Sequence, residues 1–291
     1  MNEHKAFVLA EQAALSEHDL TPSSEPISAA DLMAGEDDED QGKRPCGLPG
    51  VDWVFDGGLP YFGTALVCSP GGSGKSTFLW ELLKKVSTKE RGTLYLSSEQ
   101  SLKSLRRQLK RCGPPPVHMT VHAEQDYDKI IRTIEKEQPK ILVLDSLHHV
   151  INITDEAGFN LAAGSPTAVT HVAKSIISLT SELEFLAFLV GHMNNDGTMA
   201  GGAHLRHAVD GTLVIRRLNP LIQKDPRRIL EFENKSRFGE IGRRALFEMT
   251  KDGMKDRGPM GDEPIEAIEA IEQDLNVSRR SKRNGSDYGK N

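Results

Sequence analysis

Short apolar runs alternate with amphipathic stretches through the middle of this 291-residue chain. The apolar runs predict strands at residues 64–68, 93–97, 117–121, 141–145 and 185–190. Stretches with helical spacing separate them, at residues 78–86, 101–111, 127–137 and 167–183. Strands that are apolar throughout are typical of a parallel sheet buried on both faces. The pattern therefore predicts an α/β fold with a mostly parallel twisted sheet and helices on both faces.

Three further apolar runs follow toward the carboxyl end, at residues 212–215, 229–232 and 245–249. Their connections are much shorter than the helical connections between the earlier strands. Antiparallel neighbours need only a short connection, whereas parallel neighbours need a crossover. We therefore expect antiparallel or edge strands at the C-terminal side of the sheet.

Charge divides the chain into three parts. Residues 1–45 carry 3 basic and 11 acidic side chains, residues 46–258 carry 28 and 24, and residues 259–291 carry 5 and 7. The acidity of the chain thus lies in its ends, and the middle part is mildly basic. We expect residues 46–258 to form the folded core, whose charge permits a polyanionic partner without proving one.

The two ends read differently from the core. Residues 1–45 predict an acidic, largely disordered arm with a short helix at residues 4–20 and an acidic run at residues 36–40. A solvated tail is the simpler interpretation; the alternative is an arm that docks a protein partner or mimics DNA. Beyond residue 259, Pro264 begins a predicted helix. The basic cluster at residues 279–283 then either contacts phosphates or only keeps the tail soluble.

Composition argues against several classes of protein. The three cysteines lie far apart without a C-x-x-C pair, so they suggest neither a cysteine zinc site nor a disulfide framework. No apolar run reaches the roughly 18 residues of a membrane span, and the first residues lack a signal-peptide pattern. We expect a cytoplasmic protein that does not associate with a membrane.

A glycine-rich turn lies between the first predicted strand and the first predicted helix. Its residues are Ser69, Pro70, Gly71, Gly72, Ser73, Gly74, Lys75, Ser76 and Thr77. Strand, glycine-rich turn and helix form the context of a phosphate-binding P-loop, in which glycines let backbone N–H groups approach a ligand. Lys75 would reach the outer phosphates, and the Ser76 hydroxyl would ligate Mg²⁺. Serine stands at position 69 where the motif usually has glycine. A chance turn is the alternative; we predict a site for ATP with Mg²⁺.

Polar residues end three other predicted strands, where a parallel sheet places its ligands. Asp145 has the position of a Walker-B carboxylate, able to hold Mg²⁺ through water; a solvent-facing aspartate at a strand end is the alternative. Glu99 could orient and activate the attacking water, although a helix-capping glutamate is the alternative. His192 and Asn194 could sense the γ-phosphate and pass its state to the glycine-rich segment that follows.

Together these segments resemble the RecA-like core ATPases, and most of all their RadA/Sms branch. The resemblance covers about residues 46–254. It rests on the segments LYLSSEQS (94–101), VLDSL (143–147), VGHM (190–193), GTMAG (197–201) and NKSRFG (234–239). The Lys-x-Arg-Phe-Gly element is nearly private to this branch, where asparagine is usual at the position of Ser236.

The resemblance implies an active site shared between subunits. Lys235 and Arg237 would reach the γ-phosphate of a neighbouring subunit in a ring or filament, with a hexamer favoured; surface cations on a turn are the alternative. It also makes residues 194–207 a flexible loop that contacts single-stranded DNA. The expected contacts there are Gly197, Gly201, His204, Arg206 and His207.

Some features depart from the branch. Its members carry an N-terminal four-cysteine zinc finger and a C-terminal Lon-protease-like domain, neither of which the sequence contains. We therefore expect a stripped ATPase core, encoded by a phage or mobile element in one interpretation. The favoured function is a DNA-dependent ATPase, helicase or translocase in recombination, repair or replication. The alternative is a KaiC-like or mediator-type ATP-binding switch that protein partners read.

Overall fold

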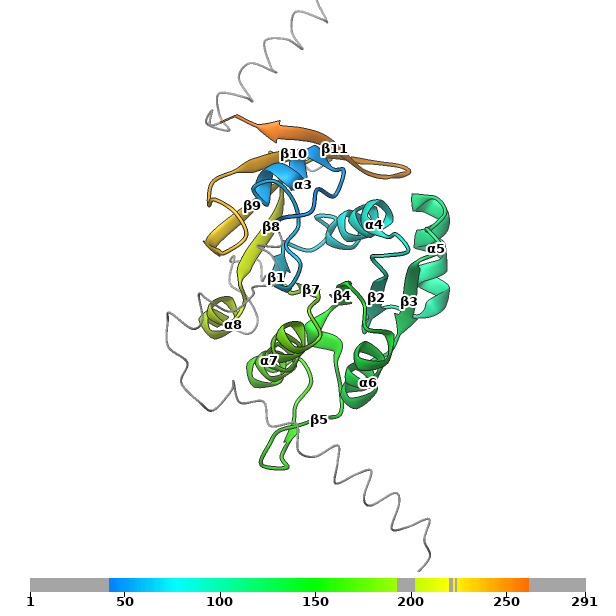
Figure 1. Cartoon of the computed structure of the whole chain (residues 1–291), viewed down its shortest axis with the longest axis vertical. Coiled ribbons are helices and arrows are strands. Elements are labelled where there is room, and N and C mark those ends of the chain that lie inside the picture. The colour runs from blue at the N-terminus through cyan, green and yellow to red at the C-terminus, as the bar shows by residue number, and fades with distance from the viewer. Residues whose placement is uncertain (1–41, 193–201, 220–221, 223, 262–291) are drawn as a thin grey trace, which may run out of the picture. The chain divides into compact units, whose positions relative to one another are not determined.

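The computed structural model describes residues 42–192, 202–219, 222 and 224–261 (Figure 1), all within one compact unit. Several predictions lie outside these residues and stay predictions. They are the helix at residues 4–20, the acidic run, Asn194, Gly197, Gly201, the helix beginning at Pro264 and the basic cluster at residues 279–283. The domain boundaries also remain predictions.

Nine strands form one sheet in the order β11-β10-β9-β8-β1-β7-β4-β2-β3. They are β1 (Gly63–Cys68), β2 (Thr93–Ser97), β3 (Met119–Ala123), β4 (Ile141–Asp145), β7 (Leu186–Val190), β8 (Gly211–Arg217), β9 (Arg227–Ser236), β10 (Arg244–Thr250) and β11 (Gly253–Met260). From β8 through β1 to β3, every neighbouring pair is parallel. From β8 to β11, every pair is antiparallel. The predicted mixed sheet is confirmed.

The structure corrects some details of this sheet. The strand expected at residues 117–121 is β3, which begins at Met119. The run at residues 212–215 is not purely antiparallel, because β8 pairs in parallel with β1 on its other side. Strand β11 has no counterpart among the predicted strands. A two-stranded hairpin of β5 (Ile153–Thr154) and β6 (Asn160–Leu161) was also not expected.

The helices lie on both faces of the sheet, as Figure 1 shows for α4 and α5 on one side and α6 and α7 on the other. Their bounds are α3 (Pro49–Val54), α4 (Lys75–Val86), α5 (Leu102–Cys112), α6 (Tyr127–Glu137), α7 (Pro166–Glu182) and α8 (Gly202–Ala208). Side chains of Ser101, Asp126 and Ser165 cap the first turns of α5, α6 and α7. Among the described residues, no helix is both long and apolar enough to cross a membrane.

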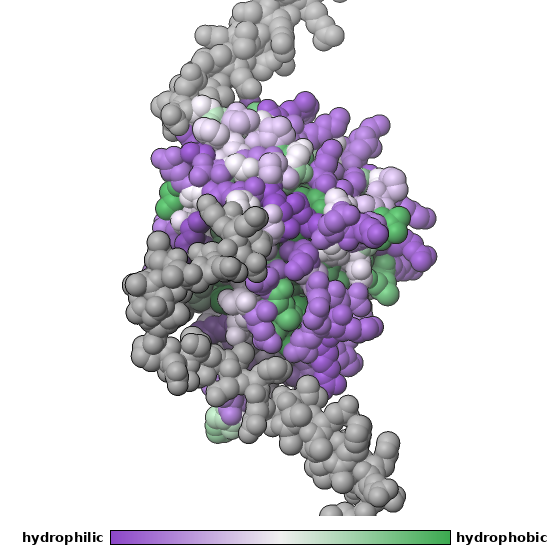
Figure 2. Space-filling view, in the orientation of Figure 1, coloured by the Kyte–Doolittle hydropathy of each residue, from purple (hydrophilic) through white to green (hydrophobic). Residues whose placement is uncertain are grey.

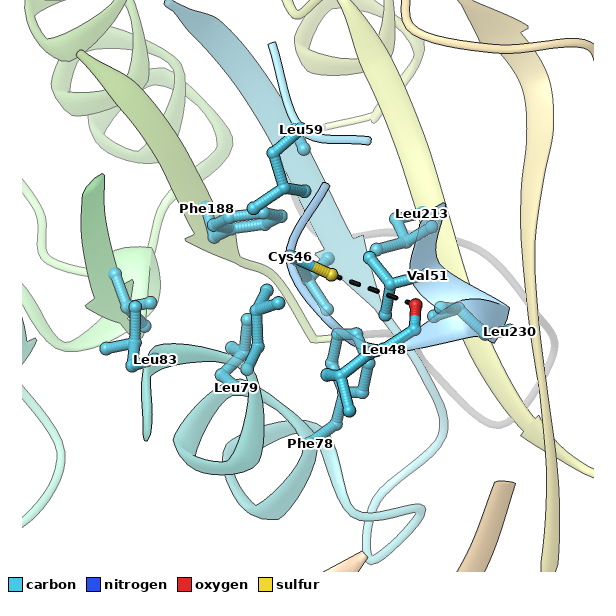
Figure 3. Packing of buried hydrophobic residues seen from close by; sticks show 14 of the residues in the cluster. Cys46, Leu48, Val51, Leu59, Phe78, Leu79, Leu83, Phe188, Leu213 and Leu230 are labelled. Atoms are coloured by element: carbon cyan, nitrogen blue, oxygen red, sulfur yellow. Dashed lines mark hydrogen bonds between the residues drawn. The ribbon is translucent and has the colours of Figure 1, made fainter. Parts of the chain in front are cut away.

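Side chains of successive residues in the central strands point to opposite faces of the sheet and pack into two separate hydrophobic layers. In β1, Ala65 and Val67 belong to the cluster that includes α3 and α4, whereas Leu66 and Cys68 belong to the cluster that includes α6 and α7. Figure 3 shows the first layer, where Phe78, Leu79 and Leu83 of α4 lie among side chains of α3 and the sheet. Burial on both faces explains why the sequence of β1 is apolar throughout.

All three cysteines, Cys46, Cys68 and Cys112, are buried and form no disulfide. Burial raises the pKa of the Cys68 thiol to about 12. In contrast, the described surface visible in Figure 2 is mostly hydrophilic, with hydrophobic residues in small separate patches. On that face, polar and charged side chains dominate the surface that the described residues present.

Candidate active site

The glycine-rich turn connects the carboxyl end of β1 to the first residue of α4. Gly72 and Gly74 adopt φ angles of 72° and 100°, which favour glycine, whereas Gly71 does not need this freedom. A side chain added at Gly71 or Gly72 would meet no atom within 4 Å, so the space over the turn is open. Backbone N–H groups at the start of α4 face a site suited to an anion.

Side chains of strands β9, β10 and β11 pack against the glycine-rich turn. A Cβ added at Gly74 would lie 2.4 Å from Cε of Met249 and 2.8 Å from Cε of Met254. The buried Arg228 of β9 donates Nε to the Ser73 carbonyl at 2.8 Å. Its Nη1 donates to the carbonyls of Asp225 and Arg227. The antiparallel strands thus fix the conformation of the P-loop.

Lys75 lies at the first position of α4 with 8% of its surface exposed. Its ammonium donates to the backbone oxygen of Ser69 at 3.2 Å and to the Ser69 hydroxyl at 3.1 Å. Serine at this unusual position therefore gives the lysine a hydrogen-bond acceptor. Burial lowers the pKa of Lys75, and the negative charges of Asp145 and Glu99 oppose that shift.

Asp145 is a buried carboxylate at the carboxyl end of β4. Its Oδ2 accepts hydrogen bonds from the Ser76 hydroxyl at 2.6 Å and the Tyr95 hydroxyl at 2.5 Å. Burial and the neighbouring Asp145 raise the pKa of Tyr95 well above its ordinary value, so the phenol stays a donor. The Tyr95 ring also stacks on Trp80 of α4, with ring centroids 4.3 Å apart. The two predicted Mg²⁺ ligands are therefore in contact.

Glu99 and His192 meet beside this pair. His192 Nε2 lies 3.7 Å from Glu99 Oε2, and both side chains are partly exposed, 38% and 42% respectively. Burial and the Lys75 charge lower the pKa of His192, whereas Glu99 opposes that shift. The four strand ends predicted to carry the chemistry, those of β1, β2, β4 and β7, thus converge at one edge of the sheet.

This arrangement can be compared with known proteins. The sequence model of a family described as an AAA domain matches residues 31–198, more than half of the chain. The chain belongs to the AAA-domain family. It is similar to the "DNA repair protein RadA" of Aquifex aeolicus, at 32% identity over 75% of this chain and 47% of the relative. The RadA protein of Escherichia coli is 28% identical over 72% of this chain and 44% of the relative.

The chain spans less than half the length of these two relatives. Its fold is also similar to that of a KaiC-like protein, PH0186, from Pyrococcus horikoshii. The TM-score is 0.58 at 18% identity, over 74% of this chain and 98% of the other. This similarity shows the fold alone. The comparisons confirm the resemblance inferred from the sequence: the chain is a RadA-like P-loop ATPase of the RecA superfamily.

Lys235 and Arg237 lie at the opposite end of the sheet, near the start of β1. Lys235 Nζ donates to the His207 carbonyl at 2.7 Å, and Arg237 Nη1 pairs with Asp210 Oδ1 at 2.7 Å. Asp210 in turn accepts a hydrogen bond from the backbone of Thr64, at the start of β1. Since the P-loop follows the end of β1, about 16 Å along the strand, the two cations do not reach the P-loop of their own chain.

The expected flexible loop at residues 194–207 is wrong in its second half, because α8 (Gly202–Ala208) is helical. Buried Leu205 and Val209 anchor this segment in the hydrophobic layer, which the glycines in the sequence concealed. His204, Arg206 and His207 all belong to α8. Arg206 is close enough to Cys68 that its charge lowers the pKa of that thiol, against the larger effect of burial.

Several side chains of the site were not identified from the sequence. They are Tyr95, Ser146, His149 and Arg228. Tyr95 carries one signal, a hydroxyl in an otherwise apolar buried strand, where a buried phenol needs a partner. Arg228 contacts Ser73, which lies 155 positions earlier in the sequence, so no local sequence pattern predicts this contact.

Proposed function

We propose that this AAA domain hydrolyses ATP with Mg²⁺ and that single-stranded DNA stimulates the reaction in recombination, repair or replication. The observation that carries the proposal is the convergence of Lys75, the Ser76–Asp145 pair and Glu99 beside an open glycine turn. Support for the DNA part comes from relatives that are called DNA repair proteins. A helicase or translocase activity is the fuller form of this proposal.

The donor set fits the proposed ligands. Oxygen atoms of Ser76 and Asp145 are the kind that Mg²⁺ prefers, and the open turn with Lys75 suits phosphates. In this mechanism Lys75 balances phosphate charge, and Tyr95 holds the Asp145 carboxylate in place. Glu99 accepts a proton from the attacking water, while His192, 3.7 Å from Glu99, and Asn194 sense the γ-phosphate.

The proposed site is completed by a second subunit. Lys235 and Arg237 lie at the sheet edge remote from their own P-loop, so they would serve a neighbour in a ring or filament, with a hexamer favoured. The Arg237 side chain is 69% exposed, and Asp210 keeps its hydrogen bonds from Thr64 without it, so moving Arg237 to a neighbouring subunit costs only about 1 kcal/mol. Cations of this kind stabilise charge on the transferring phosphoryl group, worth roughly 10³–10⁵ in rate where measured.

Contacts with single-stranded DNA are proposed for α8 and the segment before it, with Arg206 and His207 joined by Gly197, Gly201 and His204. Arg206 belongs to α8, which packs on α7 and precedes β8. Phosphate contacts give salt-dependent affinity, with a log–log slope of about −0.7 for each phosphate neutralised on single strands. Since residues 46–258 carry 28 basic and 24 acidic side chains, we expect a shallow slope.

A second candidate function is an ATP-binding switch that protein partners read. The acidic residues before position 41 favour it, because an acidic arm is a segment that can dock a protein partner. Under this alternative, nucleotide state would change partner binding, and DNA would leave turnover unchanged.

ATP turnover measured with and without single-stranded DNA tests the proposal. We expect DNA to raise turnover of the wild type. Glu99→Gln should still bind nucleotide but lose most turnover, because the cradle is intact and the base is gone. Glu90→Gln, an exposed glutamate in the loop after α4, is the matched control and should behave as wild type. If single-stranded DNA leaves the ATP turnover of the wild type unchanged, the ATP-binding switch becomes the favoured function. If Glu99→Gln hydrolyses ATP at the wild-type rate, the role proposed for Glu99 is wrong.

A further inference from the structure

Two histidines and a glutamate gather at the strand ends beside the P-loop. Glu99 follows β2, His149 lies in the 3-10 turn after β4 (Leu147–His149), and His192 follows β7. One potential ligand atom from each lies within 4.8 Å of the other two. Three neighbouring strands thus bring together a set of donors that sequence reasoning treated separately or missed.

The hydroxyl of Ser146 lies between the two imidazole rings. Its Oγ is 2.9 Å from His149 Nδ1 and 3.2 Å from His192 Nε2. Ser146 is fully buried, and its backbone N–H donates to the Ser98 hydroxyl at 3.0 Å, which fixes its position. The Ser146 hydroxyl can donate to one of these nitrogens and accept from the other, so one fixed residue holds both rings beside Glu99.

We propose that Glu99, His149 and His192 form a binding site for a divalent transition-metal ion, such as Zn²⁺, distinct from the Mg²⁺ pair. Two imidazoles and one carboxylate suit Zn²⁺ and its neighbours, whereas Mg²⁺ prefers oxygen alone. Ligands about 2.0–2.2 Å from such an ion lie roughly 3–3.5 Å apart, so the cluster must contract by about 1 Å. The partial exposure of Glu99 and His192 leaves both side chains room to do so.

Occupancy of this site would inhibit ATP turnover. This consequence rests on the proposed function, in which the Glu99 carboxylate accepts the proton of the attacking water. A carboxylate oxygen bound to a metal ion holds that proton less well, so the base would be lost while Lys75 still binds phosphate and Ser76 still binds Mg²⁺. The site would then act as a brake that transition-metal ions apply and chelators release.

Metal binding is measured first, by calorimetric titration of Zn²⁺ into the full chain in buffer that contains Mg²⁺. Three proteins are compared: wild type, His149→Ala and His118→Ala. His118 is an exposed histidine in the loop before β3 and serves as the matched control, since histidines and acidic residues elsewhere in the chain also attract Zn²⁺. We expect wild type and His118→Ala to share one tight site that is at least about tenfold weaker in His149→Ala. Equal binding by all three proteins would overturn the site.

Turnover is measured second, with ATP and Mg²⁺ across a range of Zn²⁺ concentrations. The Zn²⁺ response of each variant is measured relative to its own turnover without Zn²⁺, and His149→Ala should require about tenfold more Zn²⁺ for half inhibition than the wild type. Inhibition of wild type and His149→Ala at the same concentration would overturn the brake. Should the protein lack ATPase activity altogether, the proposed function fails, whereas the calorimetric comparison still decides the metal site.

Discussion

The Asp145 carboxylate is held by two hydroxyl donors of different kinds. Ser76 belongs to the P-loop and would leave for a metal ion, whereas Tyr95 is buried within the sheet and would stay. A fixed donor of this kind restricts the carboxylate to one orientation and lowers the reorganisation needed when a metal binds. Tyr95 is thus a positioning residue in the proposed chemistry.

Replacing Tyr95 by phenylalanine should therefore weaken the use of Mg²⁺. The ring keeps its stacking on Trp80, but Asp145 loses one donor, at a cost of about 1 kcal/mol in folding free energy. We expect the Mg²⁺ concentration for half-maximal turnover to rise about tenfold. Tyr127→Phe removes a comparable hydroxyl bond, to Ser175, and is the control. An unchanged Mg²⁺ requirement in Tyr95→Phe would contradict this role.

At the level of residues, the sequence predicted those site residues that lie in a known motif or directly after an apolar strand. Lys75, Asp145, Glu99 and His192 were found in this way, and the structure brings them together. Tyr95 could not be assigned, because its partner lies two strands along the sequence, on a neighbour known only from the fold. His149 was overlooked because the turn after β4 carried no pattern of its own.

At the level of elements, the antiparallel strands β9 to β11 support the P-loop. Arg228 holds the Ser73 carbonyl, and two methionine side chains fill the space that a Cβ on Gly74 would need. Parallel strands supply the reactive groups, and the antiparallel extension supplies rigidity behind them. The nucleotide cradle thus depends on a part of the chain more than 150 positions away.

Arg228→Met should weaken nucleotide binding without touching a phosphate ligand. It leaves the carbonyl oxygens of Ser73 and Asp225 without this donor, whereas the Arg227 carbonyl still accepts from the Leu218 N–H, and each buried unsatisfied group costs about 1–3 kcal/mol. We expect a lower unfolding temperature and roughly tenfold weaker nucleotide affinity by calorimetry. Arg216→Met, which loses only the ion pair between the exposed Arg216 of β8 and Glu231 of β9, is the control. Equal affinities for the two variants would argue against this support.

The predicted elements succeeded where burial imposes a strong pattern and failed where it does not. The central strands are apolar throughout, so their existence could be read directly. Strand β11 contains Gly253, Gly258, Pro259 and alternating charges, because an edge strand is paired on one side only. Helix α8 begins at a glycine, and its stability comes from tertiary burial of Leu205 rather than from helix propensity.

At the level of the whole molecule, the sheet separates two sets of charged groups. The P-loop, Glu99 and Asp145 lie at the carboxyl ends of the parallel strands, and Lys235 and Arg237 lie at the other ends. A head-to-tail assembly would place one set against the other in adjacent subunits. One chain therefore offers both halves of the proposed site without being able to join them itself.

Two inactive variants should then restore activity when mixed. Lys75→Ala lacks a working P-loop, and Arg237→Ala lacks the cation for its neighbour. Random mixing yields intact pairs at about a quarter of the interfaces. Turnover at several protein concentrations should rise above the sum of the separate variants, and more so at higher concentration. Arg257→Ala is the control: it removes an exposed arginine of β11 that pairs with Glu248, and it should hydrolyse ATP on its own without mixing. Strict additivity would argue for a site within one subunit.

Because Cys68 is buried at the end of β1, the rate at which its thiol is labelled reports how often the strand opens next to the P-loop. Thiol reagents react with the thiolate, and a pKa of about 12 leaves almost none at neutral pH. Labelling therefore requires local unfolding at the end of β1, and the labelling rate measures how often this unfolding occurs. Saturating nucleotide should slow labelling of Cys68, followed by mass spectrometry, by the factor 1 + [L]/Kd. Cys112, at the end of α5, is the internal reference; equal protection of both thiols would mean that the molecule opens only as a whole.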